Sequence, residues 1–228
     1  MTSKTLVWDL PIRIFHWLLV AAIAGAWYTA EEGYEDTHMK IGYAIIGLLI
    51  YRIVWGIFGT EHSLFRSFIP SPFKLYQHTK NIFKVDAKQS VGHNPLGALS
   101  ALIMLFLIGL QAATGLFTKG EIWYGPYTSA VGSELQKRLD GIHHANFDFI
   151  LVALGVHIVA IFFYLFFKKQ NLITPMIHGK KNDEVVPNGK GIPHSKLLVA
   201  VILALVVAAF TYWLCFISPP EVIYDDYY

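Results

Sequence analysis

The sequence has few charged residues and almost no cysteine. Asp, Glu, Lys and Arg together make up 15% of the 228 residues, well below the share of about a quarter that soluble domains carry. The single cysteine, Cys215, excludes a disulfide framework and a cysteine-ligated iron–sulfur or zinc site within the chain. No Cys-x-x-Cys-His motif occurs, so no c-type haem is attached. No cleavable signal peptide is expected, because no small-residue cleavage site follows the first apolar run.

Hydrophobic residues are abundant instead, at 54% of the chain, and aromatic residues reach 15%. These values are typical of a polytopic membrane protein. The apolar segments long enough to span a bilayer are residues 12–30, 38–58, 95–117, 141–167 and about 196–217. The sequence therefore predicts an all-α membrane protein with five transmembrane helices.

Aromatic residues also gather in two of the expected loops. The loop after the second span is basic and carries Phe65, Phe68, Phe73, Tyr76 and Phe83, which predicts a segment lying on the membrane surface. The loop after the third span carries Trp123, Tyr124 and Tyr127, which indicates an interfacial aromatic belt.

The basic residues define an orientation. Fourteen of the 18 Lys and Arg residues fall at the N-terminus, at the end of the second span, or in the second-to-third and fourth-to-fifth loops. The positive-inside rule therefore predicts a cytoplasmic N-terminus and, with five spans, a C-terminus on the opposite side. The acidic residues expected on that outer side are Glu31, Glu32, Glu35, Asp36, Glu121, Glu134, Asp140, Glu221, Asp225 and Asp226.

Four histidines fall at two matching depths in this topology. His143 and His157 are fourteen residues apart, so they project from one helix face within about 40° and lie roughly 21 Å apart along the axis. His38 begins the second span on the outer side, level with His143. His16 lies early in the first span, level with His157. Two pairs result: His16 with His157, and His38 with His143.

Two histidines at one level suit a b-type haem, which a helix bundle can hold between two axial imidazoles. Zinc or copper would need more ligands at each level. The alternative is that the histidines are hydrogen-bonded within the bundle or hydrated at its ends. His144 faces about 220° away from His157, so the outer ligand is assigned to His143 rather than to His144.

Further residues are candidates for the haem surroundings. His144 and Asp148 share another face; either they form a hydrogen-bonded pair or a proton-handling group, or both are satisfied separately in the outer interfacial layer. Arg52 either pairs with a haem propionate or marks the cytoplasmic helix end. Asp9 and Arg13, four residues apart, are expected to form a surface pair. Three glycines either let a porphyrin approach the backbone or serve plain helix packing; they are Gly25, Gly42 and Gly47.

Several stretches resemble the bacterial cytochrome b561 family, which includes the cytochrome b subunits of nickel–iron hydrogenase and is related to those of formate dehydrogenase. The resemblance covers roughly residues 5 to 182. The stretches that carry it are Val7-Trp8-Asp9-Leu10-Pro11-Ile12-Arg13-Ile14-Phe15-His16-Trp17, His38-x-x-x-Gly42-Tyr43, Arg52-x-x-Trp55-Gly56, Gly92-His93-Asn94-Pro95-Leu96-Gly97 and Met176-Ile177-His178-Gly179-Lys180-Lys181.

The resemblance implies a four-helix transmembrane bundle with two b haems in the bacterial inner membrane. Residues 1–182 would form this dihaem domain, and residues 183–228 would add a loop, the fifth helix and a periplasmic tail. A quinone site is implied near the haem on His16 and His157. His93 is then expected to hydrogen-bond a propionate or a quinone oxygen, and Asn94 to cap the third helix.

The leading hypothesis is a dihaem cytochrome b that exchanges electrons between the quinone pool and a periplasmic partner. A multihaem c-type cytochrome and a hydrogenase iron–sulfur subunit are the candidate partners. No catalytic side chain and no nucleic-acid partner are expected, and dimerisation is left open. One alternative is a self-contained superoxide:quinone oxidoreductase that attracts its anion through Lys40, Lys137 and Arg138. Another is a haem-free transporter or assembly subunit.

Overall fold

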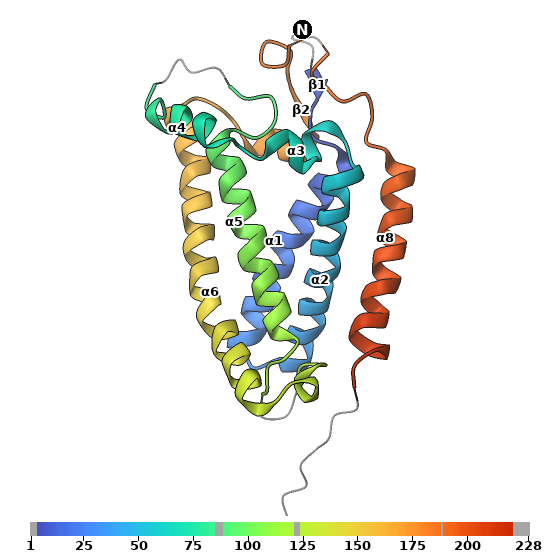
Figure 1. Ribbon diagram of the computed structural model, residues 1–228. Coiled ribbons are helices and arrows are strands. Elements are labelled where there is room, and N and C mark those ends of the chain that lie inside the picture. Colours follow the sequence, from blue (N-terminus) through green and yellow to red (C-terminus); the bar gives the residue numbers. More distant parts are fainter. Residues whose placement is uncertain (1–3, 85–88, 121–123, 188, 221–228) are drawn as a thin grey trace, which may run out of the picture. The chain divides into compact units, whose positions relative to one another are not determined.

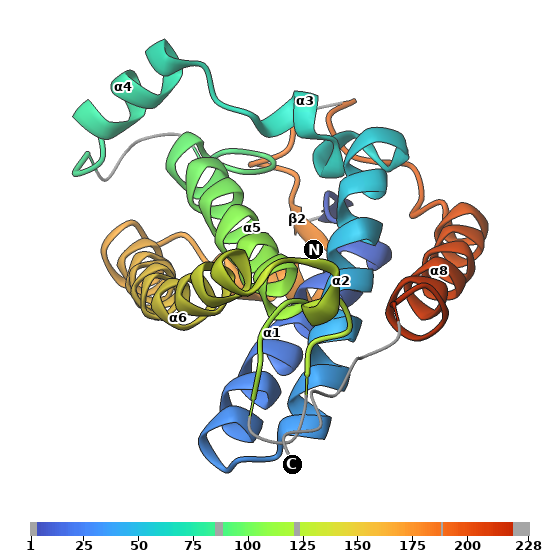
Figure 2. The same cartoon turned by 60° about the horizontal axis from the view of Figure 1, so that its bottom comes forward.

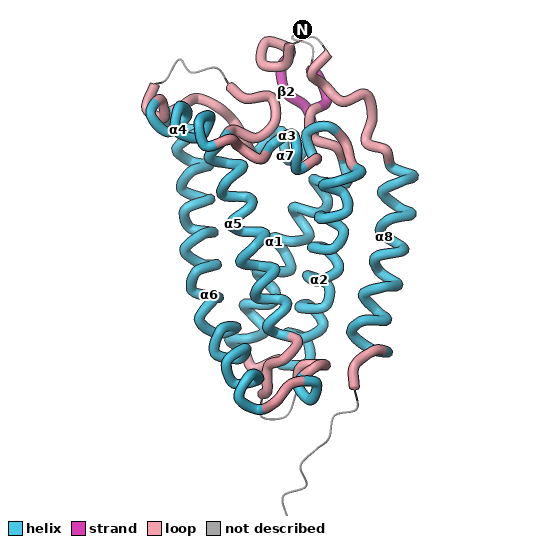
Figure 3. Tube along the Cα trace, viewed as in Figure 1, coloured by secondary structure: helices cyan, strands magenta, loops and turns pink. Residues whose placement is uncertain are grey.

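The computed structural model describes residues 4–84, 89–120, 124–187 and 189–220. Helices make up most of this part of the chain (Figure 3). Several predicted features lie outside the described residues: Lys88, Glu121, the Trp123 of the aromatic belt, and the tail 221–228 with its acidic residues.

Among these described residues, five helices are long and apolar enough to cross a membrane, which confirms the all-α class and the number of predicted spans. They are α1 (Leu10–Glu31), α2 (Glu35–Phe58), α5 (Pro95–Gly115), α6 (Ser133–Phe162) and α8 (Leu197–Tyr212). The last two each continue into a π-helical turn, Phe163–Phe167 and Trp213–Ile217.

The start of α6 differs from the prediction. The helix begins at Ser133 rather than at Gly141. Its first two turns are polar and contain an i, i+4 ion pair, Glu134 with Arg138 at 3.0 Å, of the kind that supports an exposed helix. A hydropathy pattern indicates where the chain enters lipid. Where the helix begins depends instead on backbone hydrogen bonds and on the helix propensity of the residues, and these can extend a helix into water. Gly141 is tolerated inside the helix.

Short elements precede the first long helix or connect the long helices along the chain (Figure 1). They are β1 (Lys4–Leu6), the 3-10 turn Glu61–Ser63, α3 (Phe65–Phe68), α4 (Pro72–Lys80), the 3-10 turn Thr128–Ala130, α7 (Ile173–His178) and β2 (Lys180–Asn182). The two strands pair antiparallel, with Thr5 opposite Lys181. Gly179, at φ 81°, ends α7 in the left-handed region, where glycine is favoured. Its carbonyl accepts hydrogen bonds from the backbone N–H groups of Val7 and Trp8, at 2.8 and 3.0 Å.

The chain divides into two units. The first comprises Met1–Trp17, Arg52–Met104 and Val152–Ile202, and therefore holds both strands, α3, α4 and α7. The second comprises Leu18–Tyr51, Leu105–Leu151 and Leu203–Tyr228. It holds the tight turn between α1 and α2, visible in Figure 2, where Gly33 has a φ of 71°.

A buried carboxylate, that of Asp9, joins several segments of the first unit through hydrogen bonds. Asp9 is fully buried and caps α1 by accepting a hydrogen bond from the Ile12 N–H at 2.7 Å. It also accepts hydrogen bonds from the Trp55 indole N–H at 3.3 Å and from the hydroxyls of Thr60 and Ser63.

The predicted surface pair of Asp9 with Arg13 is therefore wrong. Asp9 precedes the helix and points inward, so the i, i+4 rule for helical side chains does not apply to it. Arg13 donates to the backbone carbonyls of Asp9 and Ile177 instead, at 3.3 and 2.5 Å.

In the second unit α8 packs against α2. A Cβ placed on Gly47 would lie 3.1 Å from the Thr211 hydroxyl, and the Tyr43 and Phe216 rings meet edge to face at 5.3 Å. Gly25 likewise faces Ile41, at 3.3 Å. The sequence leaves two roles open for these glycines, close approach of a porphyrin or helix packing. Helix packing accounts for Gly25 and Gly47.

Candidate functional site

The second unit brings His38 and His143 together. His38 is the fourth residue of α2, and His143 is the eleventh residue of α6. Their ring centres are 6.2 Å apart and their planes are inclined at 86°. Both residues are partly buried. Tertiary packing therefore joins the outer pair that helix phase and depth predict.

Each of these imidazoles is held by a backbone carbonyl at its Nδ1 atom. The His38 Nδ1 lies 2.8 Å from the Ala26 carbonyl oxygen, and the His143 Nδ1 lies 3.0 Å from that of Gln111. A carbonyl only accepts hydrogen bonds, so Nδ1 carries the proton and donates, and Nε2 keeps its lone pair. Metal-binding histidines are commonly oriented by such a bond.

The spacing of the two rings fits one metal ion with two axial imidazoles. Metal–imidazole bonds of about 2 Å on either side of an ion put the ring centres about 6 Å apart. Within the described residues, no three His, Cys, Asp or Glu side chains converge to hold a metal ion. A bare ion would lack ligands here, whereas the iron of a haem brings its own nitrogens and needs only two more. The donor set therefore fits a haem.

A glycine provides room for the His143 ring. A Cβ on Gly115 of α5 would stand 3.0 Å from Cε1 and 3.3 Å from Nδ1 of His143. Both distances are below ordinary van der Waals contact, so a larger residue would displace the ring. Thr114 adds a hydroxyl 3.4 Å from the same Nδ1 atom.

The first unit contains the other predicted pair, His16 on α1 and His157 on α6. The two imidazoles are close enough for the charge of one to act on the other. The His16 ring packs edge-on against Trp17 at 5.0 Å. Its Nδ1 is buried and has no hydrogen-bond partner among the described residues. A buried polar atom of this kind calls for a further partner, such as a bound group or water.

His143 and His144 have different surroundings, as helix phase predicts. His143 is partly buried beside α5, whereas the His144 side chain is 77% exposed. The predicted pairing of His144 with Asp148 is wrong. His144 lies 3.9 Å from Asp140, one turn earlier on the same helix, because both i−4 and i+4 neighbours share its face and only one of them is approached.

Arg52 is buried rather than exposed at a helix end. It is 4% exposed, donates to the Ser63 carbonyl at 3.1 Å, and stacks over the rings of Phe65 and Phe68 at 4.7 and 5.5 Å. Such cation–π contacts stabilise a guanidinium that has left water. The buried carboxylate of Asp9 is also near enough for its negative charge to act on this guanidinium, as a buried cation requires.

His93 lies near this cation. Its ring packs between Trp8 and Phe68, at 4.7 and 4.6 Å between ring centres, and its Nδ1 is buried without a partner in the described part of the chain. Burial lowers the pKa of His93 to about 3, and the charges of Arg52, Lys181 and His62 act in the same direction. The imidazole is therefore neutral at physiological pH.

The predicted helix cap at Asn94 is confirmed. Its Oδ1 accepts a hydrogen bond from the Gly97 N–H at 2.8 Å, two residues after the start of α5 at Pro95.

Sequence reasoning missed the residues that orient the outer histidines. Besides Gly115, they are Gln111 and Asn146, whose Nδ2 donates to the Leu107 carbonyl at 2.9 Å and to the Gln111 Oε1 at 2.8 Å. A polar residue inside an apolar span indicates a functional or buried hydrogen-bonding position. Gln111 and Asn146 are both such residues and could have been found in this way. The carbonyl of Ala26 gives no such indication, because every residue has one.

The cations proposed to attract a superoxide anion are mostly neutralised. Lys40 pairs with Asp36 at 2.6 Å, and Arg138 pairs with Glu134 at 3.0 Å. Of the three, Lys137 alone has no ion pair within the described residues. Exposed pairs of this kind cancel much of the attraction that free cations would exert. This arrangement gives the superoxide alternative no support.

Spanning helices that carry paired histidines are typical of integral-membrane b-type cytochromes. The chain belongs to the prokaryotic cytochrome b561 family, whose model matches residues 7–179.

Three curated relatives carry the name probable Ni/Fe-hydrogenase B-type cytochrome subunit. The protein of Rhodobacter capsulatus is 24% identical over 216 residues, covering 78% of this chain and 82% of its own length. That of Rhizobium leguminosarum bv. viciae is 26% identical over 211 residues, covering 77% and 87%. That of Azotobacter vinelandii is 23% identical over 210 residues, covering 76% and 86%. No solved structure matches the chain significantly.

Family membership makes the protein a multi-pass membrane cytochrome that transfers electrons, and it implies haem b as the cofactor. The reading of a haem-free transporter or assembly subunit is therefore wrong. The ligands, the number of haems and the redox partners remain to be assigned from the residues of this chain.

Proposed function

We propose that this protein is a dihaem electron conduit between the quinone pool and a redox partner on the periplasmic side of the bacterial inner membrane. His38 and His143 would ligate one haem b, and His16 and His157 the other. The observation that carries the proposal is the separation of 6.2 Å between the His38 and His143 rings. The hydrogen bonds that leave both Nε2 atoms free support it.

Bis-histidine haem supplies a one-electron redox centre with no open position for oxygen or substrate. The residues around it hold and tune that centre. Because the Nδ1–H groups of His38 and His143 donate to carbonyls, their Nε2 atoms become better electron donors and the rings cannot rotate. Asn146 fixes Gln111, whose backbone carbonyl is one of the two acceptors.

Arg52 and His93 are proposed to serve the haem of the first unit. Arg52 is a buried cation suited to a propionate carboxylate. His93 offers a neutral imidazole with a buried, unpartnered Nδ1, which suits a hydrogen bond to a propionate or to a quinone oxygen. Since fourteen of the 18 basic residues lie on the cytoplasmic side of the proposed topology, His16, His157 and these neighbours are assigned to that side.

The names of the relatives suggest the partner. Because each of them is called a B-type cytochrome subunit of a Ni/Fe hydrogenase, the first candidate is a hydrogenase iron–sulfur subunit, and a multihaem c-type cytochrome is the second. Glu31 and Glu32, both exposed at the end of α1, favour a partner with a basic docking patch, because complementary charge speeds encounter.

Spectra of purified protein test the ligand assignment. Reduced-minus-oxidised spectra should show b-type bands, and a pyridine haemochrome assay should give two haems per chain. Replacing any one of His16, His38, His143 or His157 with alanine should reduce that number to one. The exposed His144 provides a matched control, since His144→Ala should keep both haems. Loss of the outer haem in His144→Ala, with retention in His143→Ala, would refute the assignment.

The electron path is tested separately. A quinol added to the oxidised wild-type protein should reduce the haems, and His93→Leu should slow that reduction while the haem content stays unchanged if His93 contacts quinone. If His93 holds a propionate, the same variant should instead shift the potential of one haem. Wild-type protein whose haems are not reduced by quinol would rule out the proposed quinone link.

A further inference from the structure

Two lysines in the first unit are buried without a carboxylate. Lys168 and Lys181 are 5% and 6% exposed, although lysine is almost never fully buried unless it is paired. Lys168 Nζ donates to the carbonyl of Lys84, and Lys181 Nζ donates to the carbonyl of Ser90 at 2.9 Å. Neither lysine forms an ion pair within the described residues. An ammonium has three donors, so each lysine retains hydrogen-bonding capacity and an uncompensated charge.

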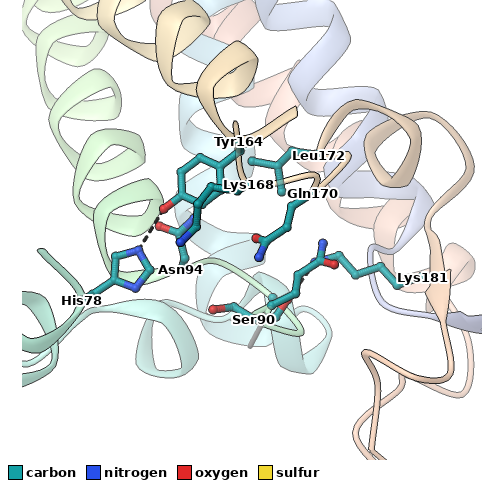
Figure 4. A pocket seen from close by; sticks show the side chains of 10 residues that line it. His78, Ser90, Asn94, Tyr164, Lys168, Gln170, Leu172 and Lys181 are labelled. Carbon is teal, nitrogen blue, oxygen red and sulfur yellow. Dashed lines mark hydrogen bonds between the residues drawn. The ribbon is translucent and has the colours of Figure 1, made fainter. Parts of the chain in front are cut away.

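Both lysines line one cavity that is open to solvent; its empty volume of about 340 Å³ includes the solvent space at its mouth. Figure 4 shows the side chains of Lys168, Gln170 and Ser90 around this space, with Lys181 reaching toward it from β2. His78 lines the cavity from α4, and its Nε2 lies 2.9 Å from the Tyr164 hydroxyl, the contact drawn as a dashed line. Among the described residues no Asp or Glu lines this cavity. Its walls therefore offer positive charge and hydrogen-bond donors, the complement of an anion.

Exposed aromatic side chains lie on the segment that carries His78, which lines the cavity, and Lys84, whose carbonyl accepts a hydrogen bond from Lys168. On α4 and just after it, Phe73, Tyr76 and Phe83 are 71%, 62% and 73% exposed. Phe83 also packs against Phe163 and Phe167 at the end of α6, at 6.1 and 6.4 Å between ring centres. Aromatic and aliphatic side chains beside cationic ones are typical of a membrane–water interface. An anion bound in the cavity would therefore have exposed aromatic side chains nearby.

We propose that this cavity binds the phosphate group of an anionic phospholipid, with Lys168 and Lys181 as its cationic ligands and the adjoining aromatic side chains against the acyl chains. Basic pockets beside transmembrane helices are known to hold lipid headgroups. Free phosphate shares the charge but not the acyl chains, so it leaves the exposed aromatic residues without a partner. A quinone ring is neutral and would leave both ammonium groups uncompensated.

Burial lowers the pKa of Lys181 to about 8, because removal from water disfavours the charged form. A phosphate beside the ammonium would raise this pKa and favour the charged form further. The site involves none of the four histidines assigned to haem, and its test measures bound lipid rather than haem.

Lipid retention by purified full-length protein tests the proposal. Delipidated wild-type protein and a Lys168→Gln/Lys181→Gln variant are incubated with phosphatidylglycerol or phosphatidylcholine, passed through gel filtration and assayed for bound phosphorus and by native mass spectrometry. Wild-type protein should retain phosphatidylglycerol in preference to phosphatidylcholine. The double variant should bind roughly tenfold more weakly, as expected for the loss of charged hydrogen bonds. A Lys74→Gln/Lys80→Gln variant removes two exposed charges from α4 and should behave as wild type.

Equal retention by the double variant and wild type would overturn the proposal, as would equal retention of the two lipids. Inorganic phosphate is the third probe: its retention without that of phosphatidylglycerol would assign the site to a free anion and overturn the lipid assignment. If the double variant does not fold, Lys168→Gln is compared with Lys168→Arg. The arginine variant should retain the lipid and the glutamine variant should lose it, and equal retention by these two would also overturn the proposal.

Discussion

Gly115 lies directly against the imidazole of His143. A Cβ at position 115 would stand 3.0 Å from Cε1 and 3.3 Å from Nδ1, while that same Nδ1 atom donates to the Gln111 carbonyl at 3.0 Å. The ring therefore fills the space that a side chain on α5 would take. Gly115 and the Gln111 carbonyl lie one turn apart on α5, so this helix both makes room for the His143 ring and orients it.

Replacing Gly115 with alanine should displace this ring. The new methyl group requires His143 to shift by a few tenths of an ångström, which weakens its hydrogen bond and loosens the proposed iron ligand. We expect a lower haem content or a shifted potential for one haem, measured by pyridine haemochrome and by redox titration. Gly109→Ala is the matched control, because nothing lies within 4 Å of a Cβ there. A Gly115→Ala protein identical to wild type in both measurements would contradict this role.

Replacing Asp9 with alanine should destabilise the first unit. The change removes the cap of α1 and the acceptor shared by Trp55, Thr60 and Ser63, for a loss of about 3 kcal/mol in the free energy of unfolding. Thermal unfolding in detergent measures it. Asp183→Ala is the control: that carboxylate accepts a hydrogen bond from Thr5 in an exposed position, and its loss should change stability by no more than about 0.5 kcal/mol.

His93 should make the protein sensitive to acid. Its pKa is about 3 in the folded protein, against an ordinary value of 6.5, so between these values the unfolded chain binds more protons. The free energy of unfolding then falls as the pH drops through this window. Melting temperatures from about pH 7 to about pH 5 should fall less steeply in His93→Gln than in wild type. His144→Gln, at an exposed position, should keep the wild-type slope, and equal slopes in all three proteins would refute the prediction.

Replacing Gly47 with a larger residue should weaken the packing of α8 against α2. A Cβ there would lie 3.1 Å from the Thr211 hydroxyl and 3.6 Å from its methyl group, so Gly47→Val should push α8 away from α2. Cys215 is 4% exposed and is the single cysteine of the chain, and its labelling by a maleimide should become faster. Gly42→Val is the control, since nothing lies within 4 Å of a Cβ on Gly42. Unchanged labelling in Gly47→Val would show that this contact does not hold the helix.

Much of the helical architecture could be read from the sequence. The five spans follow from long apolar runs, because lipid forces the backbone to satisfy its own hydrogen bonds within each segment. The cap at Asn94 follows from its place before Pro95. The distinction between His143 and His144 follows from helix phase alone. The boundary of α6 did not, because its first turns are polar and hydropathy does not detect them.

The burial of several charged residues could not be predicted from hydropathy or helix spacing. The sequence predicts a surface pair for Asp9 and gives no sign that Arg52 and Lys181 are buried, yet all three are buried. Their partners lie far along the chain: Asp9 meets Trp55 and Ser63, and Lys181 meets Ser90. Spacing rules describe neighbours on one helix, so they cannot supply contacts between helices and loops. The strand pair of Thr5 with Lys181 was missed for the same reason.

The sequence by itself determined a membrane protein of five helices with histidines at two depths, because hydropathy and helical periodicity are local properties of the chain. Only the tertiary structure decided that His38 and His143 stand 6.2 Å apart, that backbone carbonyls fix both rings, and that two lysines lie buried in one cavity. Each of these depends on which segments pack together, and packing depends on side-chain shape and hydrogen bonding across the fold rather than on any single stretch.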